Sequence, residues 1–182
     1  MNDRLQSLRN KMGGLNLQAM IIANPKNIKY LTKIDAEGIL LITRKENVFI
    51  TDGRYIEYVS SKLTPFDDIA VNDVKNIPID EYENFFLFCE NVGFEENYLT
   101  YGKYKEFIRK YKINNFVEAE DILQSLRMIK DEEEIANIKN ACEKTDECFN
   151  MLKDFIKPGM TEKQIVRRIK DFYLDEAERR SI

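Results

Sequence analysis

The 182-residue sequence contains no histidine and no tryptophan, and it contains only three cysteines. Without histidine, a hydroxyl or thiol nucleophile lacks its usual general base, so an activated nucleophile is not expected at Ser60, Ser61 or the cysteines. Cys89, Cys142 and Cys148 form no C-x-x-C pair, which argues against a disulfide framework or a zinc knuckle. The cytosol is therefore the expected compartment.

The sequence also lacks an excess of one charge and any long apolar run. Its 28 basic and 32 acidic residues are evenly mixed, and the net charge of −4 leaves no basic face for nucleic acid. The longest apolar runs, GILLI and FFLF, are far shorter than the roughly 20 residues that cross a bilayer. No apolar core follows a basic N-terminus, so we expect neither a signal peptide nor a membrane partner.

Short apolar runs alternate with helical patterns through the first two thirds of the chain. Residues 38–43 and 47–51 are β-rich and flank a polar Arg-Lys-Glu, which predicts a hairpin. The segment 52–63 begins with a potential Asp cap and predicts a helix. This alternation favours an α/β fold with a mixed β-sheet flanked by helices. Further strands are predicted over 17–25, 68–73, 91–95 and 115–120, and further helices over 1–15, 27–32, 77–90 and 99–112.

The pattern changes from about residue 121. Apolar residues recur there at alternating spacings of three and four, which predicts one helix over about 131–156. The stripe has to pack against something, because leaving its large side chains in water forfeits several kcal/mol. Its members are Ile135, Ile138, Cys142, Thr145, Phe149, Leu152 and Ile156.

A second helix is predicted directly after the first. Gly159, in Lys157-Pro158-Gly159, suits the left-handed conformation that ends a helix. Thr161 and Gln164 match a T-x-x-Q capping box, which predicts the next helix start. The result is a C-terminal helical hairpin, which is typical of the opening of a second domain. The apolar side of the second helix includes Ile165, Ile169 and Phe172.

Five phrases of the sequence carry a resemblance to a known family, which covers nearly the whole chain. In their order and spacing they resemble the Xaa-Pro aminopeptidases and prolidases of the creatinase/prolidase "pita-bread" metallopeptidase family. The phrases are YLT (30–32), TDGRY (51–55), VGFE (92–95), LRMIKDEEEIANIKNA (126–141) and IKPGMTEKQI (156–165).

The resemblance implies a creatinase-like N-terminal domain over residues 1–124. Residues 125–182 are then the linker and the first two helices of a truncated pita-bread peptidase domain. The chain is expected to be the non-catalytic N-terminal portion of a Xaa-Pro metallopeptidase, supporting dimerisation and shaping the substrate site. The implied parent is a cytoplasmic homodimer that cleaves proline-containing peptides, as an aminopeptidase or a dipeptidase.

The resemblance also implies a pair of divalent metals in the parent, which are manganese, cobalt or zinc. In the family they are held by two Asp, one His and two Glu, all beyond residue 182 of the shared pattern. We therefore expect no catalytic residue, metal or other cofactor in this chain, which is predicted to be inactive alone. Its own acidic runs, 67–68, 95–96 and 131–134, are expected to be solvated or to cap helices.

Two groups of residues keep a functional interpretation. Asp52, with Arg54 and Tyr55, is either a helix cap with its partner or part of a domain or dimer interface. In related enzymes the loop after YLT reaches the active site of the partner subunit, and the family often has Gly-Phe there. This sequence has Lys33-Ile34 instead, which puts the loop's substrate contacts in doubt. Lys33, Asp35 and Glu37 either bind a peptide terminus or are solvated.

Two alternatives to the peptidase fragment remain open. One is a non-catalytic, peptidase-like module that binds proteins. The other is a fragment of a creatinase-type amidinohydrolase, which shares the architecture and cleaves a guanidino C–N bond. A longer sequence that carries the five metal ligands distinguishes a peptidase from both.

Overall fold

The computed structural model describes residues 3–63, 69–74 and 85–179. The chain divides into two compact units, Met1–Ile129 and Lys130–Ile182. Most of the helix predicted over 77–90 lies outside the described residues. In the part that is described, Phe85 and Phe86 are helical.

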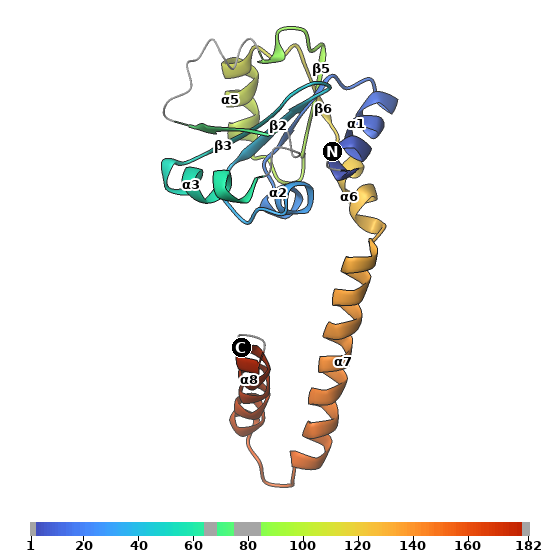
Figure 1. Cartoon of the computed structure of the whole chain (residues 1–182), viewed down its shortest axis with the longest axis vertical. Helices are drawn as coiled ribbons and strands as arrows, with labels where there is room; N and C mark the ends of the chain where they lie inside the picture. Colours follow the sequence, from blue (N-terminus) through green and yellow to red (C-terminus); the bar gives the residue numbers. More distant parts are fainter. Residues whose placement is uncertain (1–2, 64–68, 75–84, 180–182) are drawn as a thin grey trace. The chain divides into compact units, whose positions relative to one another are not determined.

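The first unit is built on a six-stranded mixed sheet in the order β4-β3-β2-β1-β5-β6 (Figure 1). Strand β2 runs antiparallel to both of its neighbours, β1 and β3, whereas the β3–β4, β1–β5 and β5–β6 pairs are parallel. This arrangement confirms the predicted mixed sheet. The strands are β1 (Ala19–Ile22), β2 (Ile39–Thr43), β3 (Asn47–Thr51), β4 (Ala70–Asp73), β5 (Asn91–Phe94) and β6 (Asn115–Glu118).

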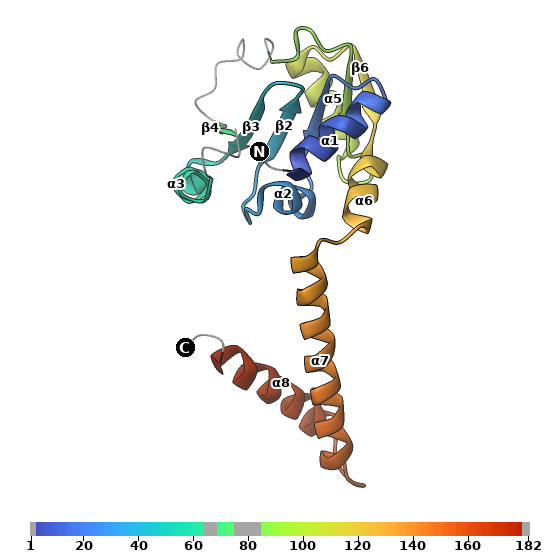
Figure 2. The same ribbon diagram turned by 45° about the vertical axis from the view of Figure 1, so that its right-hand side comes forward.

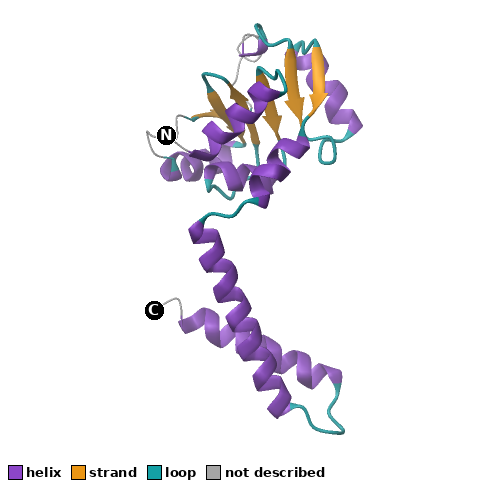
Figure 3. Ribbon diagram, turned by 90° about the vertical axis from the view of Figure 1, so that its right-hand side faces the viewer, coloured by secondary structure: helices purple, strands orange, loops and turns teal. Residues whose placement is uncertain are grey.

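Helices cover both faces of this sheet (Figures 2 and 3). One face packs against α1, α2, α3 and α6 through residues such as Leu8, Leu31 and Leu123. The other face packs against α5 through Phe107 and Tyr111. The helices are α1 (Asp3–Gly14), α2 (Pro25–Thr32), α3 (Gly53–Lys62), α5 (Tyr101–Tyr111) and α6 (Glu120–Met128).

Local capping explains why several of these helices begin where they do. The side chain of Asn24 accepts a hydrogen bond from the Lys26 amide, and Pro25 occupies the first turn of α2. Asp52 caps α3, as the sequence predicts, and Thr100 caps α5. Each cap satisfies a backbone N–H that has no partner inside its helix.

Helix α6 is an element that the sequence patterns did not reveal. The strand predicted over 115–120 ends at Glu118, and α6 begins at Glu120. Ala119, at its N-cap, makes no side-chain capping bond. The cap comes instead from Glu96, whose Oε2 accepts hydrogen bonds from the amides of Ala119 (3.2 Å) and Glu120 (3.0 Å). A cap supplied from the end of another strand leaves no local pattern to recognise.

The domain boundary expected between residues 124 and 125 falls inside α6. The two compact units instead meet between Ile129 and Lys130. Ile122 and Leu123 of α6 are buried in the core of the first unit, and Leu126 packs against that core. This packing places α6 with the sheet.

The second unit is the predicted helical hairpin, formed by α7 (Glu132–Phe155) and α8 (Glu162–Arg179). Asp131 and Glu134 form a complete capping box at the start of α7. In the turn between the helices Gly159 has a φ of 90°, a conformation that favours glycine. Gln164 accepts a hydrogen bond from the Thr161 amide at 2.8 Å, which is one half of the predicted capping box.

Candidate functional site

The loop between α2 and β2 alternates buried and exposed residues. Ile34 and Ala36 are 2% and 7% exposed and join the core. Lys33, Asp35 and Glu37, which alternate with them, are all exposed. Successive side chains of an extended segment point to opposite sides, so the apolar pair anchors the loop and the charged residues lie on its outer side.

The two ends of this loop are fixed by backbone geometry. Lys33 adopts a left-handed conformation with a φ of 58°, and its amide donates to the Lys29 carbonyl at 2.8 Å, which ends α2. At the other end, a Cβ on Gly38 would lie 2.5 Å from the Ile50 carbonyl oxygen, so only glycine fits there. The charged residues are therefore held on a fixed loop.

Asp35 is paired within the first unit. The ammonium of Lys29 lies 2.6 Å from its Oδ2, with side-chain exposures of 58% for Lys29 and 70% for Asp35. The hydrogen bond to Asp35, followed by its negative charge, raises the pKa of Lys29. Lys29 was not predicted as a site residue, although its position one helical turn before Lys33 is a signal for such a neighbour.

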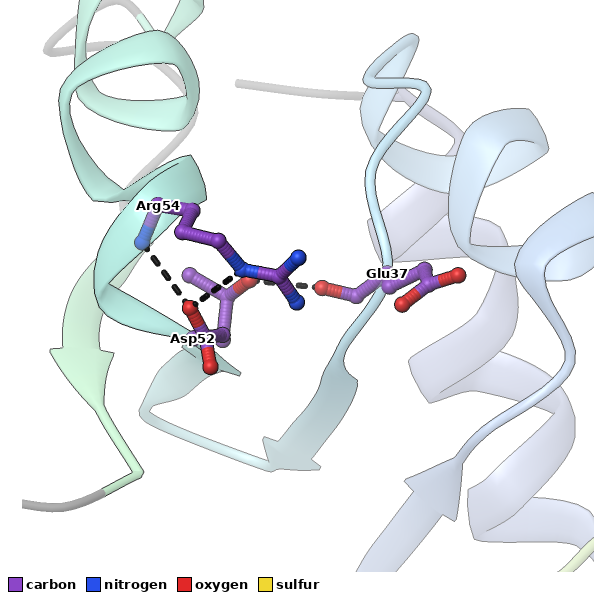
Figure 4. A network of polar contacts seen from close by, with 4 residues as sticks. Glu37, Asp52 and Arg54 are labelled. Atoms are coloured by element: carbon purple, nitrogen blue, oxygen red, sulfur yellow. Dashed lines mark hydrogen bonds and ion pairs between the residues drawn. The ribbon is translucent and has the colours of Figure 1, made fainter.

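The second predicted group lies at the start of α3 (Figure 4). Oδ1 of Asp52 accepts hydrogen bonds from the amide and the Nε of Arg54, at 3.0 and 2.9 Å. The Arg54 guanidinium also lies 5.6 Å from the centre of the Tyr55 ring. Asp52 and Arg54 thus form the expected cap with its partner, and the guanidinium remains largely exposed to solvent.

The structure brings the two predicted groups together. The hydroxyl of Thr51 donates a hydrogen bond to the Glu37 carbonyl at 2.6 Å, which ties the loop to the end of β3 (Figure 4). The hydrogen bond to Asp52, and then its charge, raise the pKa of Arg54, with smaller contributions from Tyr55 and Glu37. Thr51 was missed by sequence reasoning because its contact crosses from β3 to a loop 14 residues earlier.

The combined surface carries both charge signs on a rigid support. Its carboxylates can bind an amino terminus, and Lys33 and Arg54 can bind a carboxylate. Among the residues that the structure describes, no group of three or more His, Cys, Asp or Glu side chains is placed to hold a metal ion. The arrangement is therefore suited to binding and orienting a charged ligand.

Comparison with known sequences identifies the family that this chain resembles. Residues 4–129 match the family model described as the creatinase/prolidase N-terminal domain. The uncharacterized peptidase YqhT of Bacillus subtilis is 30% identical over 173 residues, which cover 94% of this chain and 48% of that protein. A peptidase of Staphylococcus epidermidis is 27% identical, with coverages of 92% and 48%. The chain spans about half the length of the curated relatives it matches.

Solved structures give the same picture. A Xaa-Pro dipeptidase from Bacillus anthracis superposes with a TM-score of 0.83 at 25% identity, covering 96% of this chain and 49% of that one. The N-terminal domain of the cytoplasmic peptidase PepQ from Mycobacterium tuberculosis, at 23% identity, shares the fold alone. Its TM-score is 0.60, and the match covers 69% of this chain and 99% of that domain.

Proposed function

This chain belongs to the creatinase/prolidase N-terminal domain family, and we propose that it acts as the non-catalytic N-terminal portion of a homodimeric Xaa-Pro metallopeptidase. In this proposal the parent enzyme is cytoplasmic. It is of the aminopeptidase P or prolidase type and cleaves proline-containing peptides. The second unit, Lys130–Ile182, supplies the first helices of its peptidase domain, which therefore begins a few residues after the division at 125 expected from the sequence. The matches to relatives support this division, because they extend beyond residue 129 and cover more than nine tenths of the chain.

The metal chemistry of such an enzyme does not fit the residues of this chain. The sequence has no histidine, and the described residues offer no cluster of ligands for a metal ion. The proposal therefore assigns the divalent metals, whether manganese, cobalt or zinc, to other parts of the parent. It derives no bond-breaking step from the residues present here.

The contribution of this chain to catalysis is to orient the substrate. The observation that carries this assignment is the outward display of Lys33, Asp35 and Glu37 on a loop anchored by Ile34 and Ala36. We propose that this loop reaches the substrate held by the partner subunit, where its charges contact a peptide terminus. Asp52, Arg54 and Tyr55 lie beside the loop and form part of the domain or dimer interface.

A mixed dimer of the parent enzyme tests the proposal. One subunit carries Asp35→Asn with intact metal ligands, and the other carries wild-type Asp35 with one metal ligand removed. If the loop acts across the dimer, the working metal site meets a wild-type loop, so its activity matches wild type. Placing both changes on one subunit leaves the working site facing the mutant loop. This arrangement should lower kcat/KM about five- to 150-fold, the range for a lost charged contact.

Lys29→Gln is the matched control, because it breaks the same ion pair but leaves the Asp35 carboxylate in place. It should keep kcat/KM near the wild-type value. Equal activities in the two mixed dimers would reject the action across the dimer. An equal loss for Lys29→Gln and Asp35→Asn would mean that the ion pair supports the loop and that Asp35 does not contact the substrate.

A further inference from the structure

The carboxylate of Glu95, at the end of the VGFE phrase, is buried in the first unit with a residue exposure of 1%. Its Oε2 accepts hydrogen bonds from the amides of Ala23 and Asn24, both at 2.7 Å. Its Oε1 accepts a hydrogen bond from the side-chain amide of Asn27 at 2.6 Å. Glu95 directly follows β5, so these bonds join the carboxyl ends of two parallel neighbours, β1 and β5.

This position is distinctive in an open α/β sheet. The chain leaves β1 for β2 on one side, and β5 lies on the other side. Such switch points commonly bind ligands in a crevice outside the carboxyl ends of the strands. Here the backbone donors of Ala23 and Asn24 are taken by the chain's own carboxylate.

Asn27 connects Glu95 to α6 through a second hydrogen bond. While its NH₂ group donates to Glu95, its Oδ1 accepts a hydrogen bond from Nη1 of Arg127 at 3.1 Å. Asn27 is itself 1% exposed, so both halves of its amide are used inside the first unit. Arg127 lies in the last turn of α6, two residues before the unit ends at Ile129. The chain of contacts therefore links β5, α2 and the end of α6.

We propose that Glu95, Asn27 and Arg127 form a proton-operated latch on the end of α6. Oε2 of Glu95 faces two backbone donors, so an added proton sits on Oε1, where it faces Asn27. The protonated oxygen then needs an acceptor, and the Asn27 amide supplies one by turning over. Its NH₂ group then faces Arg127, which is also a donor, and the bond between them is lost.

The surroundings of Glu95 determine the pH range in which the switch operates. Burial raises the pKa of Glu95 above its ordinary value of 4.5, and the hydrogen bonds from Asn27, Asn24 and Ala23 oppose this rise. The negative charge of Glu120 on α6 raises the pKa further. The neighbouring Glu96 accepts hydrogen bonds from the first amides of α6, and Arg127 is linked to Glu95 through Asn27. The latch is therefore closed above the raised pKa and open below it.

The sign of the linked stability change follows from the same shift. Between 4.5 and the raised pKa, the folded chain binds more protons at Glu95 than the unfolded chain does. The contribution of Glu95 to stability is therefore full below 4.5 and declines as the pH rises through this window. Closing the latch orders the end of α6 at a cost in the stability of the first unit. This inference is independent of the proposed peptidase role.

An NMR titration of the labelled 182-residue chain tests the latch directly. As Glu95 titrates, the NMR signals of its carboxyl carbon, of the Asn27 side-chain amide and of the Arg127 guanidinium should shift with one common midpoint above 4.5. Amide exchange at Leu126 and Arg127, corrected for intrinsic rates, should be about tenfold faster below that midpoint, the size expected for losing one charge-assisted hydrogen bond. Asn27 and Arg127 signals that ignore the Glu95 titration would refute the latch.

Two variants separate the latch from simple packing. Glu95→Gln presents an NH₂ group to Asn27, as the protonated acid does, so Arg127 should give its low-pH signal at every pH. In Arg127→Gln the amide exchange at Leu126 should no longer change with pH, while Glu95 still titrates. The matched control, Glu96→Gln, removes a neighbouring carboxylate but should leave the shared titration in place. If Glu95→Gln fails to fold, the wild-type titration decides the question by itself.

Discussion

The two compact units use similar helices but bury them very differently. In the first unit, Leu8 of α1 and Leu31 of α2 are fully buried against the sheet. In the second unit, Phe149 of α7 and Leu174 of α8 are 63% and 62% exposed. Cys148 is the one residue of α7 that is buried in the described structure. Local sequence is thus enough to define a helix, whereas burial requires a surface large enough to cover its apolar side.

The apolar stripe predicted on α7 shows this difference most clearly. Ile135, Ile138 and Ile156 remain 42%, 50% and 45% exposed. Two contacts with α8 involve residues of α7 outside this stripe, because Arg168 donates a hydrogen bond to the Met151 sulfur at 3.2 Å and lies 5.8 Å from the Phe155 ring. The stripe that was expected to pack against another surface is therefore largely exposed in the described residues of this chain.

The largest expected effect comes from the same substitution made once in each unit. Leu8→Ala removes a fully buried side chain, so it should lower the free energy of unfolding of the first unit by about 2–5 kcal/mol. Leu174→Ala, at a site that is 62% exposed, should change stability by no more than about 0.5 kcal/mol. Urea unfolding followed by circular dichroism measures both.

The comparison fails if the two leucine variants lose similar stability. That outcome would mean that α8 is covered in solution by a surface that the isolated chain does not show, for example in a second copy. Sedimentation of the wild-type chain at two concentrations tests directly for such a second copy.

Much of the fold was predictable because its determinants are local. The alternating runs predicted the strands, and caps such as Asp52 and Asp131 marked helix starts correctly. The family resemblance was also interpreted correctly, since residues 4–129 match the creatinase/prolidase N-terminal domain and a relative matches over 94% of the chain. The element that was not predicted depends on contacts between residues far apart in the sequence. Helix α6 is capped by Glu96, more than 20 residues earlier in the chain.

The candidate site divides in the same way. The loop residues Lys33, Asp35 and Glu37 follow from a polar-apolar alternation that is visible in the sequence, and their functional role remains a prediction. The proximity of Glu37 to Arg54 was not predictable, because it depends on how β3 and the loop meet at Thr51. The expectation that Glu95 is solvated or caps a helix was wrong, because Glu95 is buried by partners that lie just after β1 and in α2.

Hydrogen exchange sharpens the comparison at the boundary between the units. Amides of α6 should be protected together with the sheet, because Leu123 is fully buried in the first core. Amides in the middle of α7, around Ile138 and Cys142, should exchange about 100-fold faster, because local opening there exposes little new apolar surface. Mass spectrometry of peptides spanning 120–128 and 133–146, corrected for intrinsic rates, measures the difference. Fast exchange that begins at residue 125 would instead support the boundary expected from the sequence.

The smallest expected effect concerns what the two units share, which is local capping. Asp131 accepts a hydrogen bond from the Glu134 amide at 2.8 Å, and Glu134 accepts one from the Asp131 amide at 3.0 Å. Asp131→Ala removes one bond of this box and should destabilise α7 by about 1 kcal/mol. Because α7 has little packing to compensate, the loss should appear directly as reduced helicity in circular dichroism at 222 nm.

Asp131→Asn tests the cause, because asparagine keeps a side-chain oxygen that can accept the same bond and is a comparably good cap. It should retain most of the helicity, apart from a small loss of favourable charge near the helix N-terminus. If Asp131→Ala left the helicity unchanged, the first turn of α7 would be held by something other than its cap. The lesson of the comparison would then reverse, because even the helix ends of the second unit would depend on tertiary contacts. A loss in the alanine variant alone would show that α7 is specified by local bonds that act without a core.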